Sequence, residues 1–267
     1  MMLLSSITWD LFPAFGLLAM AASAGAAYLS WRDKKGASLS FSILSILILG
    51  AFIAGLWLFL DRPPMRTQGE TRLWYSFFVL LSGLLVYARW HYRWIPVFSA
   101  VLSAVFVFIN IFKPQIHSKT LMPALDSPLF VPHVISYMFA YGLLGVALLM
   151  GLYFVFWRKE KFTPRHAFVM DNLVYTGLGF LMIGLLLGAI WAKQAWGTYW
   201  AWDPKETWAA ITISAYLLFL HHRRFYPTEL KSSLVLLAVS FLFLQMCWYG
   251  VNYLPSASSS IHVYSGM

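Results

Sequence analysis

Cysteine and charge are both scarce in this chain, and each shortage excludes a class of protein. One cysteine, Cys247, is present among 267 residues, so the sequence holds neither a disulfide framework nor a paired-cysteine motif. Cys247 lies inside an apolar run, which favours a small packed side chain. Only 11% of the residues are charged, whereas a soluble domain carries about 25%. A soluble globular protein is therefore excluded.

Motifs for several kinds of chemistry are also missing. The sequence contains no glycine-rich phosphate loop and no Ser/His/Asp grouping, so it gives no sign of phosphate binding or of nucleophilic catalysis. The net charge of +9 lies in short connections and not in a basic tail, which favours a membrane-orientation signal over nucleic-acid binding. No basic residue precedes the first apolar run, so a cleaved signal peptide is not expected.

Apolar residues make up 60% of the chain, and the mean hydropathy is +0.70. Because about 20 apolar residues cross a bilayer as a helix, this composition predicts an all-α, polytopic integral membrane protein. We interpret residues 1–267 as a single membrane domain, since no soluble domain or long linker interrupts the apolar runs. Eight spans are expected, at 11–30, 39–60, 73–88, 94–112, 132–157, 171–194, 205–222 and 232–251.

Basic residues are unevenly divided between the two sides of this topology. With the N-terminus outside, the inner connections hold twelve of the 19 lysines and arginines, and the outer segments hold seven. Inner loops carry the excess of basic residues in membrane proteins. Both termini, and the connection between the sixth and seventh spans, are therefore expected on the outer face. In a bacterial inner membrane this is the periplasmic face.

Tryptophan gathers in that connection, residues 191–208, which holds five of the chain's 13 tryptophans. Tryptophan and tyrosine are common where bilayer meets water, but such a belt accounts for one or two tryptophans per helix end. Five in one connection, interleaved with Gly197, Asp203, Lys205 and Glu206, favour a flat aromatic platform for a large, planar, mostly apolar ligand.

The spacing Trp196-Gly197-x-x-Trp200-x-Trp202-Asp203 resembles the tryptophan-rich WWD signature of haem-handling cytochrome c assembly proteins. With the continuation Pro-Lys-Glu-Thr-Trp, the segment is similar to the CcsA (ResC) branch of that family. The resemblance covers about 130–262 well, and before that it rests mainly on topology.

The resemblance implies a role in system II cytochrome c maturation, together with a CcsB (ResB) membrane partner. Haem b would pass from the inner side to an outer site and be presented there to the Cys-x-x-Cys-His motif of an apocytochrome c. Trp196, Trp200 and Trp202 would cradle the porphyrin, with Gly197 and Asp203 in the same motif. This chain has no such cysteine motif, so it is not itself a c-type cytochrome. Whether it acts as a haem lyase component with its partner is left open.

Two histidines share the expected outer side with the tryptophan segment. His133 follows Pro132 at the start of the fifth span, and His262 lies in the C-terminal tail. Each alone fits an interfacial polar residue, but together they resemble an axial pair, because imidazole is the commonest haem iron ligand. The CcsA family has an external haem ligand at each of these places. A serine-rich stretch, 256–260, precedes His262 and is longer than we expect from the family.

His221 lies at the inner end of the seventh span, next to His222. An ionisable residue at membrane depth is a functional candidate, whereas the alternative is the start of a basic membrane edge. The resemblance favours function, because a histidine 13 residues after Trp208 matches the family's intramembrane haem ligand. The second ligand of that site belongs to the CcsB partner, so the inner site is expected to be incomplete in this chain.

Asp203, Pro204 and Glu206 have the spacing of a helix N-cap, a first helical residue and a capping box, which is a structural explanation for both acids. The same helix start favours anions such as haem propionates, with which Lys205 or Lys193 would pair. In the sixth span, Gly179, Gly184 and Gly188 favour close helix packing.

The remaining polar features favour solvated surface. The connection 61–72 has the composition of a solvated turn, with a docking edge for a partner or substrate as the alternative. His91, His117 and His166 are likewise interpreted as surface residues. Three other functions stay open: a CcmC-like haem-delivery subunit, a HemX-like membrane regulator of haem synthesis, and a transporter with a tryptophan belt.

Overall fold

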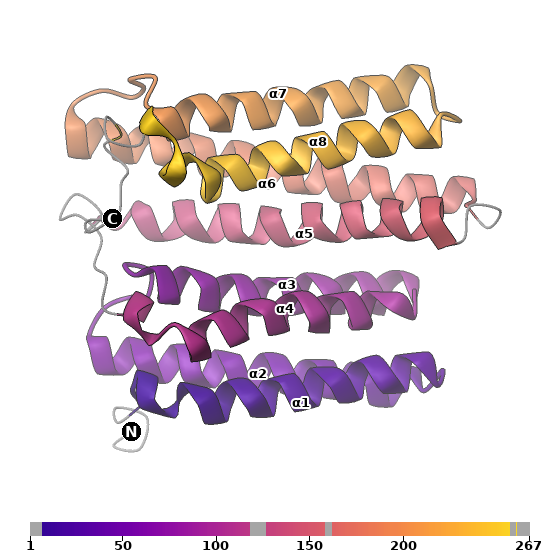
Figure 1. Cartoon of the computed structure of the whole chain (residues 1–267), viewed down its shortest axis with the longest axis horizontal. Helices are drawn as coiled ribbons and strands as arrows, with labels where there is room; N and C mark the ends of the chain where they lie inside the picture. Colours follow the sequence, from indigo (N-terminus) through magenta and orange to yellow (C-terminus); the bar gives the residue numbers. More distant parts are fainter. Residues whose placement is uncertain (1–6, 118–126, 158–161, 257–259, 261–267) are drawn as a thin grey trace. The chain divides into compact units, whose positions relative to one another are not determined.

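Eight long α-helices form the described part of the chain, which is residues 7–117, 127–157, 162–256 and 260 of a computed structural model (Figure 1). No strand occurs among these residues. The helices and the short 3-10 helices (η) are η2 Trp9–Leu11, α1 Phe12–Trp31, α2 Lys35–Leu60, α3 Gln68–Trp90, α4 Trp94–Phe112, η3 Pro114–His117, α5 Phe130–Trp157, α6 Pro164–Trp196, α7 Pro204–Phe225, α8 Leu230–Trp248 and η6 Gly250–Tyr253. Each of the eight predicted spans coincides with one α-helix, which confirms the all-α fold.

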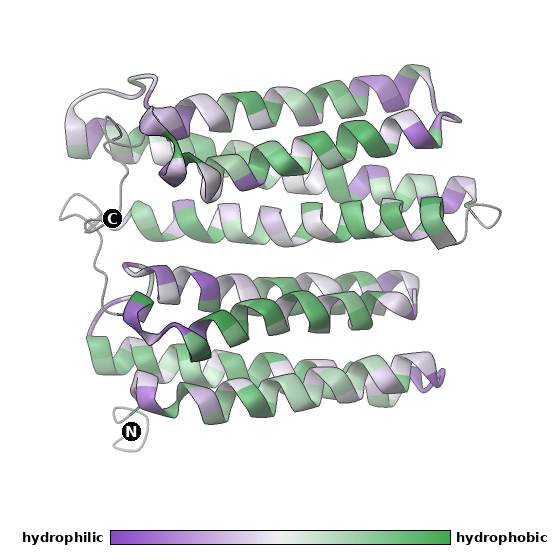
Figure 2. Ribbon diagram, in the orientation of Figure 1, coloured by the Kyte–Doolittle hydropathy of each residue, from purple (hydrophilic) through white to green (hydrophobic). Residues whose placement is uncertain are grey.

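Seven of these eight helices are long and apolar enough to cross a membrane. Within the described residues, α7 is the one long helix that does not meet this description. Polar residues lie at both of its ends, Lys205 and Glu206 in the first turn and Arg223 and Arg224 in the last, as the hydropathy colouring shows (Figure 2). The chain is an integral membrane protein, and the polar residues at both ends of α7 lower its hydropathy relative to the other long helices.

The chain divides into two compact units, one made of residues up to 121 and one of residues from 122 onward. In the first unit, α1 packs on α2, α2 on α3, α3 on α4 and α4 on α1. In the second unit, α5 to α8 contact one another in the same order. Each unit is thus a closed ring of four antiparallel helices, and their action as a single membrane domain stays a prediction.

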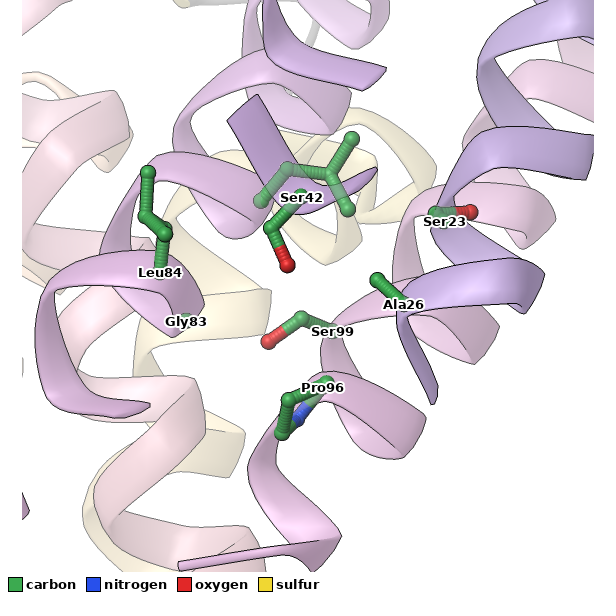
Figure 3. A pocket seen from close by; sticks show the side chains of 8 residues that line it. Ser23, Ala26, Ser42, Gly83, Leu84, Pro96 and Ser99 are labelled. Atoms are coloured by element: carbon green, nitrogen blue, oxygen red, sulfur yellow. The ribbon is translucent and has the colours of Figure 1, made fainter. Parts of the chain in front are cut away.

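Small polar residues pack the first unit. The hydroxyls of Ser38 and Ser45 on α2 donate to the carbonyls of Ala26 and Ala19 on α1, both at 2.8 Å. A pocket bounded by all four helices lies nearby and is lined in part by Ser23, Ser42, Gly83, Pro96 and Ser99 (Figure 3). Its polar groups are serine hydroxyls, so it lacks the imidazoles and exposed rings expected of a haem site.

The prediction of a solvated turn at 61–72 is wrong. Arg62 makes two hydrogen bonds to the carboxylate of Glu70, at 2.9 and 3.0 Å, and Glu70 is only 1% exposed. The same carboxylate accepts the backbone N–H of Thr67 at 3.1 Å, as part of a capping box that starts α3. Pro64, Met65, Thr67 and most of the residues after them are buried. Two of the charged residues that suggested a loop in water, Arg62 and Glu70, pair with each other instead.

His117 is not a simple surface residue either. Its ring stacks on Trp9, with 3.8 Å between the ring centroids and 10° between the planes. It also lies against Gly69, the second residue of α3. His166 is half-buried as well, where its ring lies 4.2 Å from that of Phe154. Of the three histidines predicted to lie at the surface, His91 is exposed, whereas His117 and His166 are half-buried.

Candidate functional site

The tryptophan segment is the connection between two helices of the second unit. Gly197 ends α6 with a φ of +83°, the left-handed conformation that glycine adopts without strain. Its N–H donates to the carbonyl of Lys193 at 3.1 Å, and the Lys193 ammonium donates to the carbonyl of Gly197 at 2.7 Å. Gly197 therefore acts as a helix terminator, which turns the chain toward Trp200 and Trp202.

The tryptophans are arranged in two perpendicular pairs and not as the flat platform that their density predicted. Trp191 is 1% exposed, and its ring meets Trp196 edge-on at 4.6 Å and 67°. Trp200 meets Trp202 at 5.6 Å and 89°. Trp202 is 69% exposed, and Tyr199 beside it is also exposed. The segment combines a buried aromatic base with rings that are open to a ligand.

Trp202 is held in a conformation that bulky residues rarely adopt. Its φ is +55°, which costs about 1–3 kcal/mol for a residue other than glycine. The Glu206 carboxylate accepts the N–H groups on either side of it, from Ala201 at 2.8 Å and Asp203 at 3.1 Å. The Thr207 hydroxyl donates to the carbonyl of Trp202 at 3.3 Å. Glu206 and Thr207 together fix the backbone from which this exposed ring projects.

Asp203 is the N-cap of α7, as the sequence predicts. Its carboxylate accepts the N–H of Lys205 at 2.8 Å, and the capping box with Glu206 is complete. Both acids are largely buried. Since each is occupied by backbone N–H groups, their first role is to begin α7 at a fixed residue and to hold the preceding loop.

His133 lies in the first turn of α5, where its ring packs among aromatic residues. Trp191 is 5.9 Å away and Tyr137 is 4.8 Å away between ring centroids. Nδ1 of His133 lies 2.8 Å from the carbonyl oxygen of Gly184 on α6. A carbonyl oxygen can only accept, so Nδ1 carries the hydrogen and the lone pair of the neutral ring is at Nε2. This is the tautomer that an iron ligand bound through Nε2 requires.

Of the other predicted ligands, His262 lies outside the described residues. His221 is exposed near the C-terminal end of α7, and the centroid of its ring lies 4.6 Å from that of Phe225. It is separated from Asp203 by 18 residues, or about 27 Å of helix. The structure thus brings His133 to the tryptophan segment and places His221 well away from both.

An ion pair between Asp171 and Arg223 was missed by the sequence reasoning. The guanidinium of Arg223 donates to both carboxylate oxygens, at 2.9 and 3.2 Å, and to the carbonyl of Pro227 at 2.6 Å. Arg223 is 5% exposed on its side chain, whereas its neighbour His221 is open. Asp171 is an isolated acid at the start of the sixth predicted span, and this position could have indicated a basic partner.

The family model for cytochrome c assembly proteins matches residues 8–258. The cytochrome c biogenesis protein CcsA of Chlamydomonas reinhardtii is 36% identical over 162 residues, which are 57% of this chain and 46% of that protein. The chain thus spans less than half the length of this relative.

Other curated relatives match over most of their length. CcsA of Cuscuta exaltata is 27% identical over 79% of this chain and 80% of its own length, and CcsA of Guillardia theta is 29% identical over 80% and 81%. Among solved structures, the cytochrome c haem lyase CcmF superposes with a TM-score of 0.66 at 18% identity. The match covers 92% of this chain and 46% of that protein, and it shows a shared fold.

Proposed function

This chain belongs to the cytochrome c assembly protein family, and we propose that it binds haem b at an outer site and presents it to the Cys-x-x-Cys-His motif of apocytochrome c. The arrangement that carries the proposal is His133, which packs on the base of the tryptophan segment with its Nδ1 bonded to Gly184. The names and the lengths of the CcsA relatives support the same role.

The residues of the second unit have separate parts in this proposal. His133 and His262 hold the iron, and Trp196, Trp200 and Trp202 contact the porphyrin. Gly197 and Asp203 set the ends of the two helices from which these rings project. Bound haem supplies the vinyl groups that react with the cysteine thiols, while the protein binds and orients it. The exposed ring of Trp202 supports this assignment, because a buried ring would need to be uncovered first.

We further propose that His221 belongs to an inner haem site completed by a CcsB-type partner. His221 is exposed on a helix face that also presents Leu218 and Phe225. An imidazole facing lipid would be costly, so a protein surface over this face is favoured. With the N-terminus outside, the basic residues at this end of α7 lie on the cytoplasmic side of a bacterial inner membrane, and the tryptophan segment is periplasmic.

The outer site is tested on protein purified together with its partner. His133→Ala and His262→Ala are each expected to lower the haem content and alter the visible spectrum, and added imidazole is expected to restore both. His91→Ala is the matched control, because His91 is exposed and lies in the first unit. If both variants keep the wild-type haem content and spectrum, the iron ligands are assigned wrongly.

The same purified proteins distinguish the proposed function from two related ones, a CcmC-like haem-delivery subunit and a HemX-like regulator of haem synthesis. A haem-delivery or regulatory protein would keep its haem when mixed with an apocytochrome peptide that carries the Cys-x-x-Cys-His motif. The proposed function expects haem to leave this chain and to become covalently attached to the peptide, which acid–acetone extraction detects. Haem that stays extractable would favour delivery or regulation.

The inner site is tested by His221→Ala, with the adjacent His222→Ala as its control. His222 is half-buried, and its Nδ1 lies 3.4 Å from the hydroxyl of Ser233, so it is engaged with α8. If haem enters through His221, its loss should empty the outer site in cells, although His133 and His262 are intact. An outer site that fills normally in the His221 variant would remove the inner-entry step.

A further inference from the structure

Three glycines of α6 each receive a side chain of α5 where the two helices touch. A methyl group built on Gly177 would lie 2.7 Å from Cγ of Leu144, and one built on Gly184 would lie 3.1 Å from the ring of Tyr137. The spacing is regular, because a step of seven residues along α6 is matched by a step of seven back along α5. The antiparallel register of α5 and α6 is thus defined by glycine contacts.

Four residues beyond Gly184 on α6, and four residues before Tyr137 on α5, Gly188 contacts His133 in the same register. A methyl group on Gly188 would lie 2.6 Å from Cε1 and 2.7 Å from Nδ1 of His133. Carbon atoms do not approach an imidazole this closely, so the ring occupies its position only because residue 188 has no side chain. One turn earlier on α6, the Gly184 carbonyl accepts the hydrogen of Nδ1 at 2.8 Å.

We infer that Gly188 and Gly184 are positioning residues for His133, a deduction that rests on the proposed function. Gly188 provides the space for the imidazole, and the Gly184 carbonyl directs the hydrogen to Nδ1. Tyr137 closes one side of the ring edge-on at 4.8 Å and 83°, and Trp191 lies on another at 5.9 Å. With its plane and its tautomer set, the ring presents Nε2 as the atom for iron.

The chain supplies its own control in Gly179. This residue lies on the same helix, and a methyl group built there would meet nothing within 4 Å. Alanine is preferred to glycine inside a helix, so Gly179→Ala should leave the protein folded and loaded with haem. Gly188→Ala makes the same chemical change but directs the new methyl group into the imidazole. The two variants therefore separate the contact with His133 from the effect of alanine on α6.

The first experiment measures haem retention and the visible spectrum of these variants, purified with the partner. Gly188→Ala is expected to bind haem about 10–100-fold more weakly, the usual effect of losing a residue that orients a metal ligand. Added imidazole should restore the six-coordinate spectrum, because it replaces the displaced ring. The double variant His133→Ala/Gly188→Ala should match His133→Ala alone, since the methyl group then meets no imidazole.

The outcomes distinguish this inference from the function on which it rests. If His133→Ala loses haem while Gly188→Ala behaves as Gly179→Ala does, the positioning role is overturned and the function stands. If His133→Ala keeps its haem, the function itself fails. Should Gly188→Ala not fold, the double variant decides: folding of the double variant demonstrates the clash with His133, and failure of both shows that Gly188 serves another contact.

A second measurement needs no haem. Nitrogen NMR of haem-free protein carrying ¹⁵N-histidine reports which ring nitrogen is protonated, and His133→Ala identifies the signal. The hydrogen bond to Gly184 predicts hydrogen at Nδ1 and a lone pair at Nε2. A signal for hydrogen at Nε2 would overturn the role of the Gly184 carbonyl, whatever the haem content of the variants.

Discussion

The two units have the same order of helix packing, but the residues around the start of the third helix differ between them. In both units four helices contact one another in a ring, and a 3-10 helix follows the fourth and packs on the third. Both third helices, α3 and α7, begin with a complete capping box whose third residue is a glutamate. The same scaffold and the same cap therefore occur twice.

The difference lies in the residues around that cap. In the first unit, Glu70 pairs with Arg62, and His117 stacks on Trp9 against the start of α3. Both glutamates accept two loop N–H groups, but in the second unit those groups lie on either side of Trp202, which is exposed and has a positive φ. The first unit uses its cap to bury polar groups, whereas the second uses it to present an aromatic ring. Function thus follows from the side chains around the cap and not from the topology.

The largest expected effect comes from removing the two glutamates. Glu70→Ala removes the capping-box acid of α3, the acceptor of two N–H groups and the partner of half-buried Arg62, which together cost about 3–5 kcal/mol of unfolding free energy. Glu206→Ala removes a cap and the acceptor of two N–H groups, for which about 1–3 kcal/mol is expected. Thermal unfolding of the detergent-solubilised variants measures both. If both variants lost the same unfolding free energy, the ion pair with Arg62 would contribute nothing to the stability of the first unit.

The next effect concerns ion pairs at the far end of the two units. Asp171→Ala leaves buried Arg223 without its partner and should cost about 2–3 kcal/mol. In the first unit, Asp33 and Arg93 form a pair that is mostly exposed, so Asp33→Ala should change stability by less than about 1 kcal/mol. The same unfolding measurement compares them. A large loss for Asp33→Ala would contradict the view that exposure makes this pair weak.

Asp203 supplies a smaller effect, which separates a cap from a charge requirement. Asp203→Ala should cost about 0.5–2 kcal/mol through the lost cap, and Asp203→Asn only a fraction of that, because asparagine caps nearly as well. Unfolding and haem content are measured on the same samples. A stable, well-expressed Asp203→Asn protein without haem would show that the negative charge itself is needed, a role that the cap of α3 does not have.

The smallest expected effect is a loss of stability of the first unit at low pH, caused by protonation of His117. Burial lowers the pKa of His117, against the opposing influence of the Asn110 carbonyl and the Glu70 carboxylate. Because the folded pKa lies below the ordinary value of about 6.5, the unfolded chain takes up the proton first. This contribution to stability is complete above about pH 6.5 and declines as the pH falls toward the folded pKa.

His117→Phe tests this contribution, because phenylalanine keeps a ring on Trp9 but cannot titrate. The difference in melting temperature between wild type and variant should shift in favour of the variant as the pH falls from 7 to 5. A difference that does not change with pH would show that His117 has the same pKa in the folded and unfolded chains.

The helices were predictable because their signal is local. The eight apolar runs coincide with the eight helices, and the spacing of Asp203 and Glu206 indicated a cap that the structure contains. The connection 61–72 was mispredicted for the opposite reason. Its composition is that of a turn in water, but whether Arg62 reaches a solvent molecule or Glu70 depends on how the chain folds back over α3.

The sequence named candidate residues for the site but did not predict how their rings are arranged, and their role in binding haem stays a prediction. The sequence indicated His133 and the tryptophans of 191–208, yet their density suggested a flat platform in place of two perpendicular pairs. Ring orientation depends on the turn at Gly197 and on the positive φ of Trp202. A glycine at the end of a helix is expected to adopt a positive φ, but the positive φ of Trp202 cannot be read from the sequence, since a bulky residue is not expected in that conformation.

The sequence by itself determined that this is an all-α integral membrane protein of the cytochrome c assembly family, because apolar length and similarity to the family model over residues 8–258 are properties of the sequence alone. Only the tertiary structure decided which distant residues meet. The ring of His133 lies against Gly188 and bonds to the carbonyl of Gly184 because α5 and α6 pack in one antiparallel register. That register comes from the fit of side chains between two helices, and no single stretch of sequence contains it.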